Sequence, residues 1–190
     1  KISDGEPIFI EDELPFELPE GWCWARLASL YLINPRNDTA DDTATSFIPM
    51  ANIESGYTGV VRPEVRLWKQ IKKGFTHFAD GDIVFSKISP CFENGKYFIA
   101  SNLVNGIGAG TTELFVLRPT GVCLESQYVY AYLRSKTFAK GGTETFMGTV
   151  GQQRVKRGYV EQAFLPVPPR NEQRRIANTV DFWLYALDFQ

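Results

Sequence analysis

The stretch GDIVFSKISPCFENGK, residues Gly81–Lys96, decides the fold. Its apolar run Ile83–Ile88 has Gly, Asp, Ser and Pro at its ends, which is typical of a short strand bounded by turns. Because successive side chains of a strand point to opposite faces, Val84 and Phe85 are expected on opposite sides, with Lys87 on the side of Phe85. Apolar residues on both faces predict a buried strand at the centre of the fold.

Other short strands are predicted around this one. A polar, exposed loop at residues 34–46 precedes the strand-like run FIPMANI, residues 47–53. The Gly-rich connector NLVNGIGAGTT lacks the Gly-Lys-Ser/Thr ending of a phosphate-binding loop, so bulges and turns are expected there. The remaining predictions are a strand or an entering turn at Trp22, Trp24 and Leu27, a hairpin in residues 56–67 with Pro63 at a sheet edge, and strands at Tyr97–Ala100 and Glu113–Leu117.

A helix and a polar segment follow these strands. Apolar residues between Leu124 and Phe138 recur at helical spacing and predict one helix, which Gly141 and Gly142 would end. The segment TETFMGTVGQQRVKRG, residues 143–158, is polar, basic and interrupted by glycines. It predicts a surface loop or hairpin.

A second helix is predicted at the C-terminus. Pro168 and Pro169 end the preceding strand, and Asn171 can cap the helix that follows. The apolar positions of this helix form one stripe that requires a partner helix: Ile176, Val180, Trp183, Leu184 and Leu187.

Length and composition favour one soluble globular body. A chain of 190 residues can bury one substantial core, and no apolar run approaches the ~18 residues of a membrane span. The opening lacks the features of a secretory signal, which predicts a cytoplasmic protein, and the initial Lys1 suggests a fragment of a longer chain. Residues 1–20 are expected to form an extended arm that docks through Ile8, Phe9 and Phe16.

The cysteines and the histidine make a metal site improbable. Cys23, Cys91 and Cys123 are far apart, no C-x-x-C pair is present, and His77 is the single histidine. Reduced, mostly buried thiols are expected, because free cysteine behaves as a small hydrophobe.

The net charge of −2 hides an asymmetry. The first twenty residues hold seven acidic residues and one lysine, a charge of −6, so the other 170 residues carry +4. Residues 134–157 hold six basic residues and one acidic residue, Glu144. A local basic stripe of this kind suits phosphate neutralisation, although a solvated helix face has a similar composition.

Catalytic chemistry is hard to place in this chain. Asp80 and Asp82 flank Gly81 at a strand entrance, where Asx side chains more often bond the backbone of a turn. His77 with Cys91 would need an orienting group and an oxyanion site, and neither is legible. The sequence therefore predicts no catalytic residue.

Two polar, basic segments are candidates for a DNA-reading surface. Phosphate contacts set the register of a protein on DNA, whereas amide and guanidinium groups read base edges. The late segment offers Thr149, Gln152, Gln153, Arg154, Lys156 and Arg157. A second candidate face combines loop 34–45 with Lys69, Gln70, Lys72 and Lys73. Ordinary solvated loops remain the alternative for either segment, and Lys87 and Lys96 could be structural or could contact phosphate.

Four segments, in order, resemble the specificity subunit (S subunit) of type I restriction-modification enzymes. They are LPEGW at Leu18–Trp22, GDIVFSKISPCFENGK at Gly81–Lys96, GTVGQQR at Gly148–Arg154 and LPVPPRNEQRRIA at Leu165–Ala177. The resemblance implies an α+β fold: a twisted, mostly antiparallel, β-rich target-recognition domain with a few packed helices. It divides the chain into the arm at residues 1–20, the DNA target-recognition domain at residues 21–168 and the start of a conserved coiled-coil spacer helix at residues 169–190.

The resemblance also implies a division of labour. One domain reads one half of a bipartite target in double-stranded DNA, and the subunit itself performs no catalysis. Methyltransferase (modification) subunits and a restriction/translocase subunit are the implied partners, so S-adenosylmethionine, ATP and Mg would belong to them and no cofactor to this chain. The fragment, which ends before the pairing helix is complete, could also self-associate through its C-terminal helix.

Two other functions stay open on the residues alone. A protein-interaction module would use the helix around residues 128–138 or the final helix without DNA. A small hydrolase would need His77 with Cys91 or Asp82. Neither the target sequence nor the place of this domain as first or second reader can be obtained from these residues.

Overall fold

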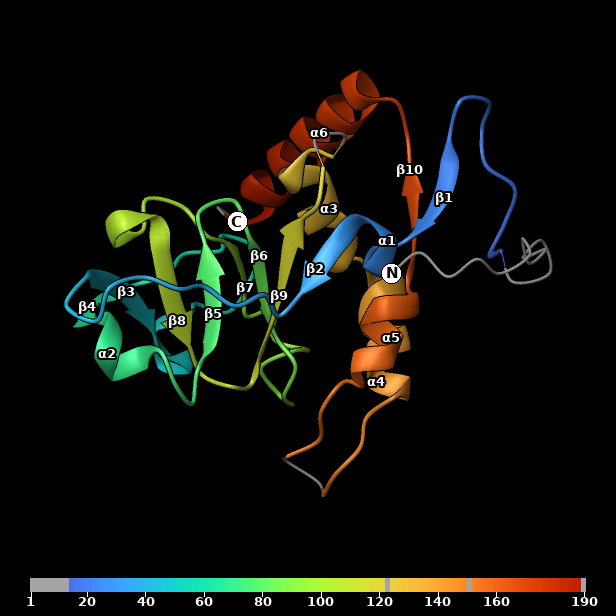
Figure 1. Ribbon diagram of the computed structural model, residues 1–190. Coiled ribbons are helices and arrows are strands. Elements are labelled where there is room, and N and C mark those ends of the chain that lie inside the picture. The colour runs from blue at the N-terminus through green and yellow to red at the C-terminus, as the bar shows by residue number, and fades with distance from the viewer. Residues whose placement is uncertain (1–13, 122–123, 150–151, 189–190) are drawn as a thin grey trace, which may run out of the picture.

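The computed structural model describes residues 14–121, 124–149 and 152–188, with side chains described up to Leu184. Two four-stranded sheets form the body, and a two-stranded ribbon and several helices lie beside them (Figure 1). Helix and strand are thus both abundant, and most strand pairs are antiparallel, so the α+β class expected from the sequence is confirmed.

The first sheet contains the strand on which the fold was predicted to depend. Its order is β2 (Tyr31–Ile33), β9 (Leu114–Pro119), β6 (Ile83–Ser86) and β7 (Tyr97–Ile99), and all its pairs are antiparallel. All four residues of β6 are buried, as its sequence predicts. The strands predicted near β7 and β9 are confirmed within a few residues.

The second sheet includes a strand that the sequence did not predict. Its order is β4 (Glu64–Leu67), β3 (Ala44–Ile48), β8 (Ile107–Gly110) and β5 (Thr76–Ala79), with β3 and β8 parallel. The prediction of bulges and turns for the Gly-rich connector is therefore wrong at β8. A Cβ on Gly108 would lie 2.6 Å from the Ser46 carbonyl oxygen, so glycine is what allows this close strand packing.

Two strand boundaries also differ from the prediction. The strand expected at residues 47–53 begins at Ala44, inside the predicted polar loop, and gives way to the 3-10 turn η2 (Met50–Asn52). Thr45 and Ser46 can be buried because their hydroxyls have hydrogen-bond partners. Thr45 Oγ1 donates to the Arg66 carbonyl (2.9 Å), and Ser46 Oγ accepts from the Val104 amide (2.9 Å).

The hairpin predicted within residues 56–67 does not form as such. A single bridge joins Ile53 to Val61, and β4 pairs with β3 instead. β4 is nevertheless an edge strand, as the preceding Pro63 indicated.

The two sheets enclose one core between them. The other face of each sheet packs against a further core of its own. Between the sheets pack Ile48, Ile53, Phe78, Val84, Phe98, Ala100, Leu103, Leu114 and Val116. Phe85 lies in a different core, formed by the other face of the first sheet with the helices, so the predicted opposition of Val84 and Phe85 is confirmed. On the outer face of the second sheet, the one-turn helix α2 (Trp68–Ile71) buries Trp68 and Ile71 against Ala109.

The single helix expected between Leu124 and Phe138 is two helices. α3 (Ser126–Leu133) ends before Ser135, whose Oγ accepts from the Phe138 amide (3.2 Å) and caps α4 (Lys136–Glu144). Gly141 and Gly142 lie inside α4 rather than after it. An added Cβ would lie 2.6 Å from the Tyr159 hydroxyl at Gly141 and 2.6 Å from the Phe92 ring at Gly142, so these glycines allow close packing instead of ending the helix.

The remaining described elements are three short helical segments, the two-stranded ribbon and the long C-terminal helix. α1 (Leu27–Leu30), η3 (Val104–Gly106) and α5 (Arg157–Gln162) are short. β1 (Cys23–Arg26) pairs antiparallel with β10 (Phe164–Val167), which joins the start of the described chain to the entrance of α6 (Arg170–Asp188). α6 begins at Arg170, so Asn171 is not its cap.

The apolar stripe predicted for α6 is divided between two environments. Ile176 packs on the core beside the buried Ala177, and Val180 and Leu184 are half-buried. α6 lies along α3, which supplies the partner for this side of the helix (Figure 1). Trp183 is 62% exposed, next to Phe182 at 66%, and the Leu187 side chain lies outside the described residues. Pairing of Trp183 with another helix therefore stays a prediction, because this side chain is exposed.

The expected burial of cysteines and of the arm holds only in part. Cys23 is exposed on the outer ribbon and Cys91 is half-buried, so the prediction of buried thiols is wrong for Cys23. Cys123 lies outside the described residues. Phe16 packs edge-on against Trp24 with ring centroids 4.9 Å apart, yet it stays 60% exposed. Ile8 and Phe9 lie outside the described residues. Within the described chain, no helix has the length and apolarity needed to cross a bilayer.

Candidate nucleic-acid interface

A hairpin between α4 and α5 projects from the body at the lower edge in Figure 1. Its two strands meet at Met147 and Arg154, whose backbone amides donate to each other's carbonyls (3.2 and 3.0 Å). Gly148 has a φ of 117°, and a Cβ there would lie 2.9 Å from the Gln152 carbonyl oxygen, so the turn requires glycine. The predicted surface loop or hairpin is confirmed at residues 145–149 and 152–156, whereas residues 143–144 belong to α4 and residues 157–158 to α5.

The base of this hairpin is fixed to the first sheet. The Ser89 amide donates to the Gln153 carbonyl (2.8 Å), and the Val155 amide donates to the Lys87 carbonyl (2.9 Å). The donor Ser89 and the acceptor Lys87 both lie in the segment that follows β6. The hairpin is therefore held by the segment that follows the fully buried β6, while Thr149 and Gln152 are exposed beyond it.

Arg154 is bound within the protein. Its Nε and Nη2 donate to the two carboxylate oxygens of Glu113 (2.8 and 2.9 Å), and its Nη1 donates to the Gln152 carbonyl (2.9 Å). Hydrogen bonds from Arg154 lower the pKa of Glu113, and the same bonds raise the pKa of Arg154. A bidentate, charge-assisted pair of this kind is stronger than a single neutral hydrogen bond.

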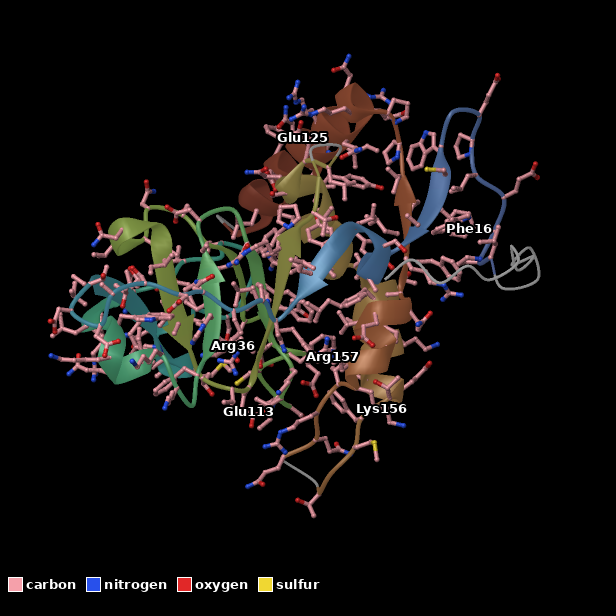
Figure 2. All side chains as sticks on the ribbon, in the orientation of Figure 1. Phe16, Arg36, Glu113, Glu125, Lys156 and Arg157 are labelled. Atoms are coloured by element: carbon pink, nitrogen blue, oxygen red, sulfur yellow. The ribbon has the colours of Figure 1, made fainter. Side chains whose placement is uncertain are left out.

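An arginine-lined cleft of about 410 Å³ lies between α1, α5 and the loop after β2. Three guanidinium groups reach it from separate elements: Arg36 from the loop, Arg118 from β9 and Arg157 from the first turn of α5. Figure 2 shows Arg36 and Arg157 on the same side of the molecule, with Lys156 beside the hairpin. Glu161 is the one carboxylate in the lining, so the cleft is basic.

The three arginines differ in how firmly the protein holds them. Arg118 donates to both oxygens of the buried Asp82 carboxylate, from Nε to Oδ1 (3.0 Å) and Oδ2 (3.2 Å) and from Nη2 to Oδ2 (2.7 Å). Arg157 pairs with Glu161 one helical turn away at 2.7 Å, an exposed pair worth only ~0.3–0.5 kcal/mol. Arg36 donates from Nη1 to the Phe75 carbonyl (3.2 Å). An incoming anion can therefore engage Arg36 and Arg157 at little cost.

Lys156 adds a cation beside this cleft. It precedes Arg157 at the foot of the hairpin and is exposed, and no ion pair involves it among the described residues. Arg36 and Arg118 were missed by the sequence analysis. Arg36 lies in a polar loop that was a candidate only as a whole. Nothing in the local sequence indicates that Arg118, on a buried strand, lines the same cleft as Arg157.

On the second predicted face, at α2 and Lys72–Lys73, two of the three lysines form ion pairs. Lys69 pairs with Asp42 (2.7 Å) and Lys72 with Asp41 (2.6 Å). Gln70 accepts a hydrogen bond from the Leu67 amide (2.9 Å), and Lys73 is exposed without an ion pair in the described part of the chain. α2 lies on the outer face of the second sheet, away from the hairpin (Figure 1). The fold thus keeps the two predicted segments apart.

Three other predicted cations have structural roles. Lys96 Nζ donates to the carbonyls of Met50 (2.9 Å) and Ile53 (2.8 Å), so it holds the η2 turn rather than forming a salt bridge. Lys87 Nζ lies 5.6 Å from the centroid of the Phe115 ring. Arg134, the first residue of the predicted basic stripe, faces inward.

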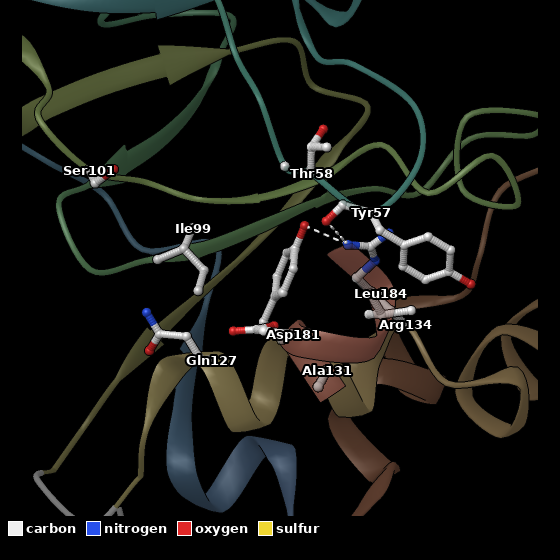
Figure 3. A pocket seen from close by; sticks show the side chains of 11 residues that line it. Tyr57, Thr58, Ile99, Ser101, Gln127, Ala131, Arg134, Asp181 and Leu184 are labelled. Carbon is white, nitrogen blue, oxygen red and sulfur yellow. Dashed lines mark hydrogen bonds between the residues drawn. The ribbon is translucent and has the colours of Figure 1, made fainter. Parts of the chain in front are cut away.

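Arg134 belongs to a different pocket, of about 370 Å³, between α3, α6 and the loop at residues 57–59 (Figure 3). Its Nη1 donates to the Tyr57 carbonyl (2.5 Å) and to the Tyr130 hydroxyl (3.0 Å), and its Nη2 donates to the Gly56 carbonyl. The guanidinium is also stacked between the Tyr57 and Tyr130 rings. Arg134 therefore fastens this loop to α3 and does not extend the basic surface.

The residues considered for catalysis support the fold. The Asn37 amide donates to Nδ1 of His77 (3.2 Å), so the ring proton lies on Nε2, which faces the Lys72 carbonyl (3.2 Å). Burial and the nearby Arg36 lower the His77 pKa. Asp80 and Asp82 accept hydrogen bonds from the Leu103 and Ala79 amides, as the turn interpretation predicts. Among the described residues, no group of three His, Cys, Asp or Glu side chains is arranged to hold a metal ion.

Comparison of sequences identifies long relatives of this chain. No protein-family model matches it. It is 42% identical over 191 residues to the type I restriction enzyme EcoEI specificity subunit of Escherichia coli, which covers 99% of this chain and 32% of the relative. It is 47% identical over 179 residues to the EcoAI specificity subunit of Escherichia coli, covering 93% of this chain and 30% of the relative. The chain spans about a third of the length of these relatives.

Comparison of structures gives the same fold. The HsdS subunit from Thermoanaerobacter tengcongensis matches 93% of this chain and 45% of its own with a TM-score of 0.72 and 22% identity. A chain from a study of complex assembly and conformational transition of the type I R-M system matches 91% of this chain and 41% of its own, with a TM-score of 0.62 and 20% identity. Over nearly its whole length, then, this chain matches one section of a type I restriction enzyme specificity subunit.

Proposed function

We propose that this chain reads one half of a bipartite DNA target as part of a type I specificity subunit. The observation that carries the proposal is the 42–47% identity to two such subunits over 93–99% of the chain. The arginine-lined cleft beside an exposed, Gln-bearing hairpin supports it, because a DNA reader needs both phosphate anchors and base-contacting side chains.

The phosphate anchors in this proposal are Arg36, Lys156 and Arg157. All three are exposed, Arg36 and Arg157 in the lining of the cleft and Lys156 directly before Arg157, and each would replace a counterion on the DNA backbone. Arg118 would shape the cleft and contribute charge while it stays bound to Asp82. The phosphate contacts would set the register of the hairpin along the duplex without reading sequence.

The base readers in this proposal lie at the end of the hairpin. Gln152 is exposed and Gln153 is half-exposed, and a glutamine amide can pair with the N6 and N7 edge of adenine in the major groove. Thr149 offers a hydroxyl on the opposite strand of the hairpin. Each mismatched base pair is expected to cost ~1–3 kcal/mol of binding free energy.

Bond chemistry would belong to other subunits. The proposed partners are the methyltransferase subunits, with S-adenosylmethionine, and a restriction/translocase subunit, with ATP and Mg. The chain would act by placing these partners on the target. The exposed Phe182 and Trp183 of α6, whose rings meet edge to face at 5.6 Å, offer an apolar surface for pairing with another helix.

A domain exchange tests the proposal directly. The segment is transferred into a full-length specificity subunit of known target, in place of one recognition domain, and the assembled methyltransferase is used to modify a plasmid. Sequencing of the methylated bases should show one changed half-site and one retained half-site. A methylation pattern that keeps both original halves would refute the proposed function.

The same exposed aromatic pair favours a second candidate, a protein-interaction module that does not bind DNA. A duplex-binding measurement at low salt separates the two. The DNA-reading proposal predicts binding that weakens steeply as salt rises, whereas a pure interaction module would show no binding at any salt concentration.

A further inference from the structure

We propose that Arg154 is a positioning residue: its ion pair with Glu113 sets the orientation of the hairpin end, and target selectivity depends on this pair rather than on contact between Arg154 and a base. The inference rests on the proposed function and deepens it. It assigns a role in selectivity to Glu113, which no local sequence pattern indicated.

The protein uses three of the five N–H groups of Arg154 and occupies its Nε/Nη2 edge. An arginine that reads guanine presents two N–H groups side by side to the O6 and N7 atoms. In this chain, Nε and Nη2 are directed at the two oxygens of Glu113, at 2.8 and 2.9 Å. The third nitrogen, Nη1, donates to the Gln152 carbonyl at 2.9 Å. Each guanidinium nitrogen is thus engaged inside the protein.

Breaking the pair near DNA would be unfavourable. The Glu113 side chain is 25% exposed and that of Arg154 41%, so water screens the pair only in part. Release of Arg154 would leave the Glu113 carboxylate without its two hydrogen bonds, close to the negative DNA backbone in the proposed complex. The closed pair is therefore the arrangement expected in the complex as well.

The pair connects the hairpin to the junction of the two sheets. Glu113 follows β8 and directly precedes β9, and its carbonyl accepts from the Lys87 amide (2.9 Å). The Lys87 carbonyl in turn accepts from Val155 (2.9 Å), next to Arg154. The backbone of Lys87 thus bonds both to Glu113 and to Val155, the neighbour of Arg154. The Arg154–Glu113 side-chain pair joins the same two segments.

The bond from Arg154 to the Gln152 carbonyl carries this constraint to the candidate readers. It fixes the peptide between Gln152 and Gln153, the two glutamines proposed to contact bases. A change at Arg154 should therefore disturb every base contact that the hairpin makes. A change at a true reader should disturb only its own base pair.

The experiment uses the complete methyltransferase complex with Arg154→Glu, Glu113→Arg and the double exchange. Binding is measured to the target duplex and to a panel of duplexes with one base pair changed at each position. Arg154→Lys, a smaller change that keeps the charge but loses the fork, covers the case in which a reversed charge prevents folding. Gln153→Ala is the matched control for a reader, and thermal unfolding checks that each variant is folded.

The positioning role predicts that Arg154→Glu and Glu113→Arg both lower discrimination at all hairpin-contacted positions. A tenfold loss at each is within the ~5- to 150-fold range that one correct base pair supplies. The double exchange should recover most of it, and Arg154→Lys should show an intermediate loss. Gln153→Ala should lose discrimination at one position only.

Two results would overturn the inference while the proposed function stands. One is a loss confined to a single base pair in Arg154→Lys and Arg154→Glu, with Glu113→Arg unaffected, because a direct reader behaves in this way. The other is no change in discrimination for any of these variants. If the unmodified complex itself discriminates no base pairs in this half-site, both the inference and the proposed function fail.

Discussion

Arg118 of β9 grips the buried carboxylate of Asp82, with Nε–Oδ1 at 3.0 Å and Nη2–Oδ2 at 2.7 Å. Asp82 is 1% exposed and also accepts a hydrogen bond from the Ala79 amide (2.7 Å). Through Nη2, Arg118 further contacts Asn37 Oδ1 (2.8 Å). One carboxylate therefore ties the end of β5 to the start of β6 and fixes an arginine of the basic cleft.

Removal of this carboxylate should destabilise the fold. Asp82→Ala leaves a partly buried guanidinium and a turn amide without their partner, for an expected loss of ~3–5 kcal/mol in the free energy of unfolding. Urea denaturation followed by circular dichroism measures it. Glu54→Ala, which breaks the exposed pair of Glu54 with Arg62, is the control and should cost less than ~1 kcal/mol. Equal effects of the two substitutions would contradict the role of Asp82.

The stability of the fold should depend on the protonation of His77. Its folded-state pKa lies below the usual 6.5, because burial and Arg36 disfavour the charged ring. The unfolded chain therefore binds the proton more readily, so this contribution is full above pH 6.5 and is lost as the pH falls from there through the folded-state pKa.

Denaturation curves measured at several pH values test this dependence on His77. The wild type should lose stability as the pH falls below 6.5, and His77→Gln, which does not titrate, should show a smaller decrease over the same interval. Identical slopes for the two proteins would assign the pH dependence to other groups.

Salt dependence of DNA binding should identify the phosphate anchors. Lys156→Ala or Arg157→Ala should each reduce the slope of log K against log salt by ~0.9, the value for one released counterion. The control is Lys69→Ala on the distant α2, where Lys69 pairs with Asp42. This substitution should leave the slope unchanged. The cleft would lose its proposed role if the α2 variant changed the slope and the other two did not.

Two glycines should respond in opposite directions to the same substitution. A methyl group on Gly108 would lie 2.6 Å from Phe78 and from the Ser46 carbonyl, so Gly108→Ala should destabilise the fold by ~1–3 kcal/mol. Gly158 lies in α5, and no atom lies within 4 Å of an added Cβ, so Gly158→Ala should stabilise by up to ~1 kcal/mol. Thermal unfolding of both variants provides the measurement, and a stable Gly108→Ala protein would contradict the close packing of β8.

The sequence predicted those elements whose own residues determine their structure. β6 has an apolar residue on each face and turn residues at its ends, and it was found where expected. The hairpin between α4 and α5 was indicated by its glycines and polar residues, which fit a tight turn on the surface. Pro168 and Pro169 likewise marked the entrance of α6.

Elements that depend on distant partners were missed. β8 reads as a turn because glycine has a low strand propensity, and only Ser46, Ile48 and Phe78 explain why glycine is needed there. The apolar spacing before Phe138 continues across two helices, and the break comes from the Ser135 cap. The cleft was found only in part, because Arg36, Arg118 and Arg157 are brought together by three separate elements.

The most direct test of the DNA-reading account is the methylation motif of the complete system with Gln152→Ala and Gln153→Ala combined. Gln152 is exposed and Gln153 half-exposed on the hairpin, so the account predicts relaxed sequence in one half of the motif and an unchanged other half. Sequencing of methylated bases in cells that carry the variant reads this out. An unaltered motif, with methylation as efficient as in the wild type, would show that the hairpin does not read DNA.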